Sequence, residues 1–315
     1  MTQLQPILAA GLTPAWQQIL CLNRLRLGQV NRAQSTHGCA SGKVVNVGLA
    51  LHQLGGPSKT LAPLGGAAGE QIAADLVRQG VPTRWVPCRT ATRVCTTLVE
   101  ASAGQITELV ENAGPLEPTE IEGYIQAFRE EASAASLIVL TGSLPEGVGS
   151  GLFDQLLQQT KTPAILDVRG EDLLAALPHQ PWLVKPNRDE LESTLGQKLD
   201  SDQALIDAMR QLNDRGAKWV LITQGAGPAW LTSAASAYRF QPEKVQVVNP
   251  IGCGDCLAAG AAWALRSGRD MPQAVQFGLA AAAANAESLL PAHVEPANVA
   301  GRVDRIQMDE LPNGR

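Results

Sequence analysis

Short runs of branched apolar residues recur along the chain, and stretches of helical length separate them. A run that is apolar throughout fits a strand that is buried on both faces of a parallel sheet. Because such runs alternate with helical stretches, the sequence predicts a layered α/β fold with a mainly parallel sheet. The predicted strands cover 136–141, 164–168, 182–185, 219–223 and 245–249.

Three helices are predicted in particular, and each ends at glycine, which accepts the left-handed conformation of a helix cap. The first has apolar residues at spacings of three and four, which places them on one face. The predicted helices begin near Gly42, Glu70 and Gly254 and end near Gly55, Gly80 and Gly268. The segments 10–40 and 84–115 have less helical periodicity, and we expect them to form a small β lid on a single domain spanning residues 1–315.

The charge balance argues against two classes of partner. The formal net charge is −5 and the sequence pI is about 5.5. Lys and Arg form no block, so neither nucleic acid nor an anionic membrane is an expected partner. No apolar run approaches the roughly 20 residues of a membrane helix. Residues 1–6 lack the basic region of a signal peptide, so the six cysteines are expected to be reduced thiols of a cytoplasmic protein.

The strongest pattern for chemistry is the segment Asn249-Pro-Ile-Gly-Cys-Gly-Asp255, which joins a predicted strand to a helix rich in small residues. Glycines in such a turn let successive N–H groups point at one anion, and the helix N-terminus adds partial positive charge. An acid here would repel a phosphate, but it could act as the base for a hydroxyl that attacks the phosphate. Asp255 could equally be a helix N-cap without any catalytic role.

This segment resembles the second signature of the ribokinase-like (PfkB) family of carbohydrate kinases. The first signature has a counterpart in residues 41–56, which begin Ser-Gly-Lys-Val-Val-Asn. Further landmarks follow in the family's order, and the resemblance covers nearly the whole chain. They are Gly65–Gly69, Thr141–Gly147, Lys185–Leu191, Thr223–Gly227 and Ala284–Ala286.

The resemblance implies a three-layer α/β/α sandwich and transfer of phosphate from ATP with Mg²⁺. The branch of 1-phosphofructokinases and tagatose-6-phosphate kinases is most similar, through residues 27–32, Thr92-Arg93, 107–109, 142–145 and 185–187. It implies a sugar that already carries a phosphate, such as fructose 1-phosphate or tagatose 6-phosphate. A free sugar or a nucleoside is the alternative acceptor.

The same resemblance assigns roles to single residues. The N–H groups of Gly252, Cys253 and Gly254 would hold the developing charge beside the base Asp255. Lys43 and Arg93 would anchor the acceptor's phosphate, and Asn46 would bond a sugar hydroxyl. A solvated lysine, a surface ion pair and a capping amide are the plain alternatives for these three. Gly42, Gly66 and Gln17 complete the expected acceptor site.

The nucleotide end is assigned in the same way. Lys185 would meet the nucleotide phosphates, while Asn187 and Glu190 would hold Mg²⁺ through water. Oxygen ligands few in number suit Mg²⁺, which keeps much of its water; a loop Asn and a helix-start Glu are the plain alternative. The nucleotide is expected to contact Thr223, Gly225, Gly227 and Asn285.

Several departures from the family pattern gather at the acceptor site. Gln17 stands where relatives carry a sugar-binding Asp, and Thr13 replaces an Asn. Cys95 and Thr97 replace an Asn and a Lys, and Ala67 replaces an Asp. A carboxamide both donates and accepts, whereas a carboxylate only accepts. At the other end, Asn249 and Pro250 stand for Asp-Thr. The sequence therefore predicts a changed acceptor pocket and a retained phosphoryl-transfer end.

Rival functions remain to be weighed. Cys253 and Cys256 form a Cys-x-x-Cys that could be redox active at a helix N-terminus. A zinc site would need a second pair, and no dinucleotide or P-loop glycine pattern is present. A sugar-phosphate sensor without turnover would fit the changed pocket, although the retained turn and Asp255 favour an enzyme. The lid could also pair edge strands in a homodimer.

Overall fold

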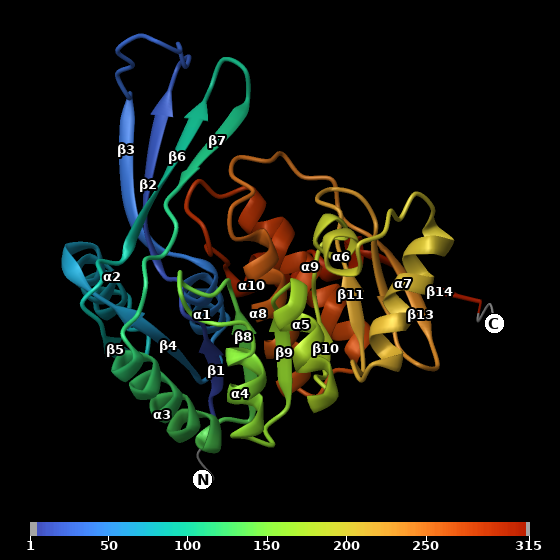
Figure 1. Ribbon diagram of the computed structural model, residues 1–315. Helices are drawn as coiled ribbons and strands as arrows, with labels where there is room; N and C mark the ends of the chain where they lie inside the picture. Colours follow the sequence, from blue (N-terminus) through green and yellow to red (C-terminus); the bar gives the residue numbers. More distant parts are fainter. Residues whose placement is uncertain (1–4, 313–315) are drawn as a thin grey trace.

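The computed structural model describes residues 5–312, so the prediction about residues 1–6 falls largely outside the described part. Within this range one sheet of ten strands forms the centre of the molecule (Figure 1). The seven strands from β5 to β11 pair in parallel, and the last three add antiparallel. In spatial order they are β5 (Thr83–Pro87), β4 (Ser58–Leu64), β1 (Ile7–Ala10), β8 (Leu137–Thr141), β9 (Ala164–Asp167), β10 (Leu183–Val184), β11 (Val220–Ile222), β12 (Ala229–Thr232), β13 (Ala237–Gln241) and β14 (Gln307–Leu311).

Helices cover both faces of this sheet, which gives the predicted three layers. Alternate residues of one strand enter opposite cores: Ile7 and Ala9 face one, and Leu8 and Ala10 the other. The first face carries α1 (Lys43–Gln53), α2 (Gly66–Arg78), α8 (Cys253–Arg266), α9 (Met271–Ala286) and α10 (Pro296–Ala300). The second carries α3 (Pro118–Ala134), α4 (Leu152–Gln158), α5 (Gly170–Ala176), α6 (Arg188–Leu195) and α7 (Asp202–Asp214). Single 3₁₀ turns lie at Leu177–His179 and Val303–Arg305.

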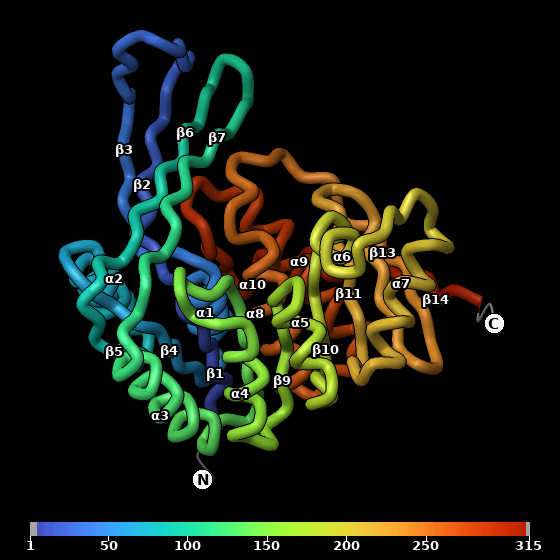
Figure 2. Tube along the Cα trace, in the orientation of Figure 1, coloured from blue at the N-terminus to red at the C-terminus, as the bar shows by residue number. Residues whose placement is uncertain are grey.

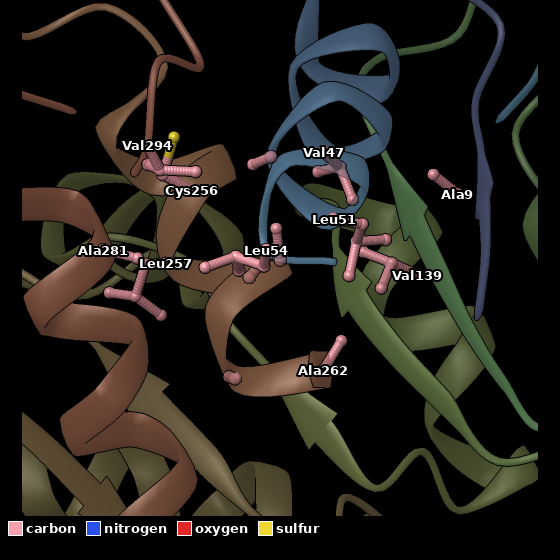
Figure 3. Close-up of a cluster of buried hydrophobic side chains, with 14 of the residues drawn as sticks. Ala9, Val47, Leu51, Leu54, Val139, Cys256, Leu257, Ala262, Ala281 and Val294 are labelled. Carbon is pink, nitrogen blue, oxygen red and sulfur yellow. The ribbon is translucent and has the colours of Figure 1, made fainter. Parts of the chain in front are cut away.

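The apolar stripe predicted on the first helix is the stripe that α1 buries. Figure 3 shows Val47, Leu51 and Leu54 between Val139 of β8 and Leu257 of α8. Helices α8 and α9 approach closely, because a Cβ added to Gly260 would lie 2.9 Å from the Cα of Gly278. The anion turn lies at the start of α8, one of these two packed helices.

A second sheet of four strands projects from one end of the main sheet (Figures 1 and 2). It forms the β lid of residues 15–41 and 93–110. The expected segment 84–115 is too long, since residues 83–87 pair with β4 in the main sheet. The strand order is β3 (Ser35–Ser41), β2 (Ala15–Leu22), β6 (Arg93–Glu100) and β7 (Gln105–Val110).

Two predicted elements differ from the structure. Residues 245–249 form no strand, because the N–H groups of Val248 and Asn249 both donate to the carbonyl of Ala286 at the end of α9. Val247 and Val248 are exposed, so their branched side chains do not mark a buried strand. Helix α2 begins at Gly66 rather than near Glu70. The predicted start is too late because the first turn consists of small residues and shows no apolar stripe.

Between residues 5 and 312, no helix combines the length and the apolar character needed to cross a bilayer.

Candidate active site

A cleft of about 510 Å³ lies where the lid meets the carboxyl ends of the parallel strands. Most of the residues predicted for the site line it, although they come from distant parts of the chain. They are Gln17, Gly42, Lys43, Asn46, Arg93, Lys185, Asn187, Glu190, Thr223, Gly252, Gly254 and Asp255. This edge of a parallel sheet is where α/β proteins usually bind ligands.

The turn before α8 has the geometry expected of an anion site. Gly252 has φ +82°, and a Cβ there would lie 3.1 Å from the amide nitrogen of Ala292, so glycine suits this position. Among the described residues, the N–H groups of Gly252, Gly254 and Asp255 find no hydrogen-bond acceptor. The N–H of Cys253 instead donates to the carbonyl of Pro250 at 3.2 Å. Free amides at a helix N-terminus can bind a phosphate.

Asp255 lies in the first turn of α8 and is 5% exposed. Asn46 Nδ2 donates to its Oδ2 at 2.7 Å, and Oδ1 accepts no hydrogen bond within the described chain. Burial, followed by the nearby charge of Asp167, raises the pKa of Asp255 to about 6 against the opposing effects of Lys43, Asn46 and Lys185. Its carboxyl is therefore mostly ionised at neutral pH and has a pKa that suits a general base.

Asp167, at the end of β9, is a site residue that the sequence reading missed. It is 2% exposed, and its two oxygens lie 3.1 Å from Lys185 Nζ and 3.2 Å from Lys43 Nζ. Burial opposes the ionisation of Asp167, but the two ammonium groups hold its pKa below the ordinary value. The sequence does carry one signal for a site residue here. Asp167 follows the apolar run 164–166 at the carboxyl end of a parallel strand, where α/β proteins usually bind ligands.

Lys185 joins this buried pair to the anion turn. Its side chain is 6% exposed, and its Nζ would lie 3.4 Å from a Cβ on Gly254. Lys43 is more open to solvent, with 42% of its side chain exposed. Burial disfavours its charge, but Asp167, Asp255 and Glu190 together raise the pKa of the Lys43 ammonium. Lys43 is therefore held as a cation at the edge of the cleft, and Lys185 is ion-paired with Asp167 beside it.

Arg93 lies at the joint between the lid and the main domain. Its guanidinium donates to the carbonyls of Thr13 at 3.0 Å, Glu111 at 3.1 Å and Pro14 at 3.4 Å. These carbonyls belong to the two segments that enter and leave the lid. These three bonds use three of the five N–H donors of the Arg93 guanidinium. The other two could still donate to a phosphate.

Two departures from the family pattern meet inside the lid. Gln17 Nε2 donates to Thr97 Oγ1 at 2.6 Å across β2 and β6, and both residues are buried. The Asp-to-Gln and Lys-to-Thr differences therefore form one neutral, hydrogen-bonded pair. Glu108 of β7 is the cross-strand neighbour of Thr97, and it lines the cleft with Gln17.

The two residues expected to hold Mg²⁺ through water close a capping box at the start of α6. Asn187 Oδ1 accepts from the N–H of Glu190 at 2.8 Å, and Glu190 Oε2 accepts from the N–H of Asn187 at 2.9 Å. In residues 5–312 no three His, Cys, Asp or Glu side chains converge as a metal cage. The Glu190 carboxylate still lines the cleft, which fits an ion held mainly by phosphate and water.

Five predicted residues do not line the cleft. Gly66 lies against Ala91 beyond the lid joint, and Gly225 and Gly227 belong to the turn after Thr223. Asn285 is fully buried: its Nδ2 donates to the carbonyl of Ile251 at 2.9 Å and to Cys253 Sγ at 3.2 Å, and its Oδ1 accepts from the N–H of His293 at 3.3 Å. Asn285 therefore supports the turn from behind, together with Cys253.

The surroundings of the Cys-x-x-Cys oppose redox chemistry. Burial raises the pKa of both Cys253 and Cys256, and the Asp255 carboxylate raises each further. The thiolate is the reactive form, and both shifts disfavour it. Both cysteines are free, and packing beside the turn accounts for them.

The fold and the cleft together define a ribokinase-like kinase, with a three-layer domain, a β lid and an acid beside an amide-lined turn. Residues 16–298 match the family model described as pfkB family carbohydrate kinase, so the chain belongs to that family. This confirms the resemblance and the prediction of an ATP-dependent carbohydrate kinase.

Solved structures agree with this assignment. The tetrameric inhibited form of phosphofructokinase-2 from Escherichia coli is similar at 25% identity, with a TM-score of 0.87 over 96% of this chain and 99% of that one. A candidate phosphofructokinase from Staphylococcus aureus is also 25% identical, with a TM-score of 0.80 over 97% and 99%. A candidate 1-phosphofructokinase from Thermotoga maritima shares the fold at 18% identity, with a TM-score of 0.88 over 97% and 99%.

Proposed function

We propose that this kinase transfers the γ-phosphate of ATP to a hydroxyl of a sugar phosphate, of the fructose 1-phosphate or tagatose 6-phosphate type, with Asp255 as the general base. The supporting observation is the position of Asp255: one carboxylate oxygen is bonded to Asn46, the other accepts no hydrogen bond within residues 5–312, and the residue lines the cleft with Gly252 and Gly254. An alcohol and a terminal phosphate can meet there.

The reaction forms a bond between the acceptor oxygen and the γ-phosphorus while the bond from that phosphorus to the ADP oxygen breaks. The hydroxyl proton passes to Asp255 as the new bond forms. The free N–H groups of Gly252 and Gly254 would hold the charge that develops on the phosphoryl oxygens. Lys185, fixed by Asp167, would place a cation beside the same turn.

Magnesium would enter with the nucleotide. Glu190 and Asn187, which both line the cleft, would bind it through water. The ion would neutralise phosphate charge.

A second cavity supports an acceptor that already carries a phosphate. Its volume is about 460 Å³, and it shares Lys43, Arg93, Asp167 and Glu190 with the main cleft. Ser143, in the Gly-Ser-Leu-Pro segment, also lines it. A phosphate there would meet the free donors of Arg93, the Lys43 ammonium and a hydroxyl. Phosphofructokinase-2 from E. coli, 24% identical and with a TM-score of 0.87, has been solved with fructose 6-phosphate.

One observation favours an unphosphorylated sugar instead. Lys43 is already paired with Asp167, and Arg93 is bonded to three carbonyls, so neither cation is wholly free for a phosphate. The neutral Gln17–Thr97 pair also adds no positive charge to the pocket.

An ADP-release assay over fructose 1-phosphate, tagatose 6-phosphate, fructose 6-phosphate, free fructose, ribose and nucleosides tests the proposal. We expect the highest kcat/KM for a phosphorylated ketose. The Asp255→Asn variant should lose about 10²–10⁴-fold in kcat, the usual contribution of a general base. Binding of these sugars without any ADP release would show a sensor, and a near-normal rate for the variant would remove Asp255 from the mechanism.

The lid also supports a proposal about assembly. Leu27 and Val30 in the connection from β2 to β3 are 89% and 86% exposed, and we propose that the lid forms a homodimer contact. Light scattering of the intact enzyme and of the Leu27→Ser/Val30→Ser variant tests it. A monomeric wild type would contradict the contact. We also propose a cytoplasmic location, in keeping with the free thiols.

A further inference from the structure

Asn46 is bonded at both ends of its carboxamide. Its Oδ1 accepts from Ser41 Oγ at 3.0 Å, and its Nδ2 donates to Asp255 Oδ2 at 2.7 Å. Ser41 and Asn46 are each 2% exposed, so solvent does not compete strongly for these bonds. Asn46 therefore contacts the candidate base directly, whereas the family resemblance implied a bond to a sugar hydroxyl.

The orientation of this carboxamide matters because its two ends differ chemically. An ionised carboxylate only accepts hydrogen bonds, so the NH₂ end must face Asp255. If the carboxamide turned round, its oxygen would face the carboxylate and repel it. A hydroxyl that donates to the oxygen end favours the productive orientation, and Ser41 occupies that position.

The chain of bonds also connects three parts of the molecule. Ser41 is the last residue of the lid strand β3, Asn46 lies in the first turns of α1, and Asp255 lies at the start of α8. Gly42 makes the sharp turn from strand to helix: it has φ +88°, and a Cβ there would lie 2.8 Å from the carbonyl oxygen of Thr13. The lid is thus tied to the base through two hydrogen bonds.

We propose that Ser41 and Asn46 are positioning residues for Asp255: Ser41 sets the orientation of the Asn46 carboxamide, and Asn46 holds one carboxylate oxygen so that the other is free for the acceptor hydroxyl. This inference rests on the proposed role of Asp255 as base. The other charged groups that act on Asp255 are Lys43 of α1, Asp167 of β9 and Lys185 after β10. Within the described residues, none of these three groups donates a hydrogen bond to the Asp255 carboxylate, whereas the Asn46 carboxamide does.

The test compares pH profiles of kcat/KM for the best acceptor in the wild type and in the variants Ser41→Ala and Asn46→Ala. A hydrogen bond donated to the charged carboxylate favours ionisation. Loss of this bond should raise the pKa of Asp255 and move the acidic limb of the profile to higher pH. The shift should be larger in Asn46→Ala, which removes the donor, than in Ser41→Ala, which only frees the carboxamide to turn. At the pH optimum we expect losses of about 10–100-fold and about 2–10-fold, the range for hydrogen bonds to charged and neutral groups.

Ser58→Ala is the matched control, because Ser58 is a buried serine of β4 whose hydroxyl has no partner in the described chain. Its profile should coincide with that of the wild type. Acidic limbs that stay in place in Ser41→Ala and Asn46→Ala, with only the acceptor KM raised, would overturn the positioning role and return Asn46 to sugar binding. If Asn46→Ala does not fold, the Ser41→Ala profile decides alone.

Asp255→Asn separates this inference from the proposed function. A variant that keeps both its rate and its acidic limb would show that Asp255 is not the base. A variant that loses turnover, while Ser41→Ala and Asn46→Ala keep the wild-type limb, would contradict only the positioning role.

Discussion

The two sides of the cleft are built by different means. On the side of the main domain, Asp255, Asp167 and Lys185 are charged and at most 5% exposed. On the lid side, the buried polar contact is the neutral Gln17–Thr97 pair, and the Glu108 carboxylate lies at an exposed strand. The ends of β9 and β10 and the first turn of α8 place these charges, whereas the lid strands present hydrogen-bonding groups above the cleft.

The two constructions differ in how easily their residues can be replaced. The buried charges of Asp167 and Lys185 depend on each other, because they come from different elements and form an ion pair, so replacing one leaves the other unpaired. A neutral pair between two lid strands can be exchanged as a unit. The departures from the family pattern at Gln17 and Thr97 occur in the lid, while the residues of the buried charge cluster are in place.

Asp167→Asn should have the largest effect on stability. It leaves the buried Lys185 ammonium without its carboxylate, and removing one member of a buried ion pair costs about 3–5 kcal/mol. We expect the free energy of unfolding, measured with urea, to fall by that amount. Glu130→Gln is the control, since Arg84 and Glu130 are each 50% exposed and their pair should contribute less than about 1 kcal/mol. Equal losses in the two variants would contradict the distinction.

Asp255→Asn should lose activity but gain stability. The folded pKa of about 6 lies above the ordinary 3.8, so ionising Asp255 is less favourable in the folded protein than in the unfolded chain. Below about pH 4, Asp255 is protonated in both the folded and the unfolded protein, so its ionisation does not affect stability. Above about pH 6 it is ionised in both, and the full cost of ionising it in the folded protein lowers the free energy of unfolding. The neutral variant should therefore be more stable by about 2–3 kcal/mol at pH 8. Urea titrations at pH 5 and pH 8 check this, and an equal difference at both pH values would contradict it.

The lid pair should have the smallest effect. In a double-mutant cycle with Gln17→Leu and Thr97→Val, the hydrogen bond should contribute about 0.5–1.5 kcal/mol of coupling to the free energy of unfolding. Gln17→Leu should also raise the KM for the acceptor while leaving the KM for ATP unchanged, because Gln17 lies on the lid side of the cleft. A raised KM for ATP would show that the two sides are not separate.

The glycine-rich turn, the acid in it and the strand-helix alternation follow from local patterns, so the sequence could predict the fold class and Asp255. Pairing between distant segments has no local signal. For that reason the sequence did not predict that Asp167 pairs with two lysines, or that Asn46 contacts Ser41 and Asp255. Residues 245–249 show the opposite error: a run rich in branched apolar residues predicted a strand, but these residues form none.

Backbone geometry and apolar periodicity are properties of short segments, so the order of the amino acids was enough to predict a layered α/β kinase with an amide-rich turn and an acid at a helix start. The way in which the charges are shared depends instead on contacts between distant segments. It places Asp167 between two lysines from different elements, gives the carboxamide of Asn46 to Asp255, and joins Gln17 to Thr97. These contacts span 80 to 209 residues for Gln17 and Asn46, and burial determines their strength.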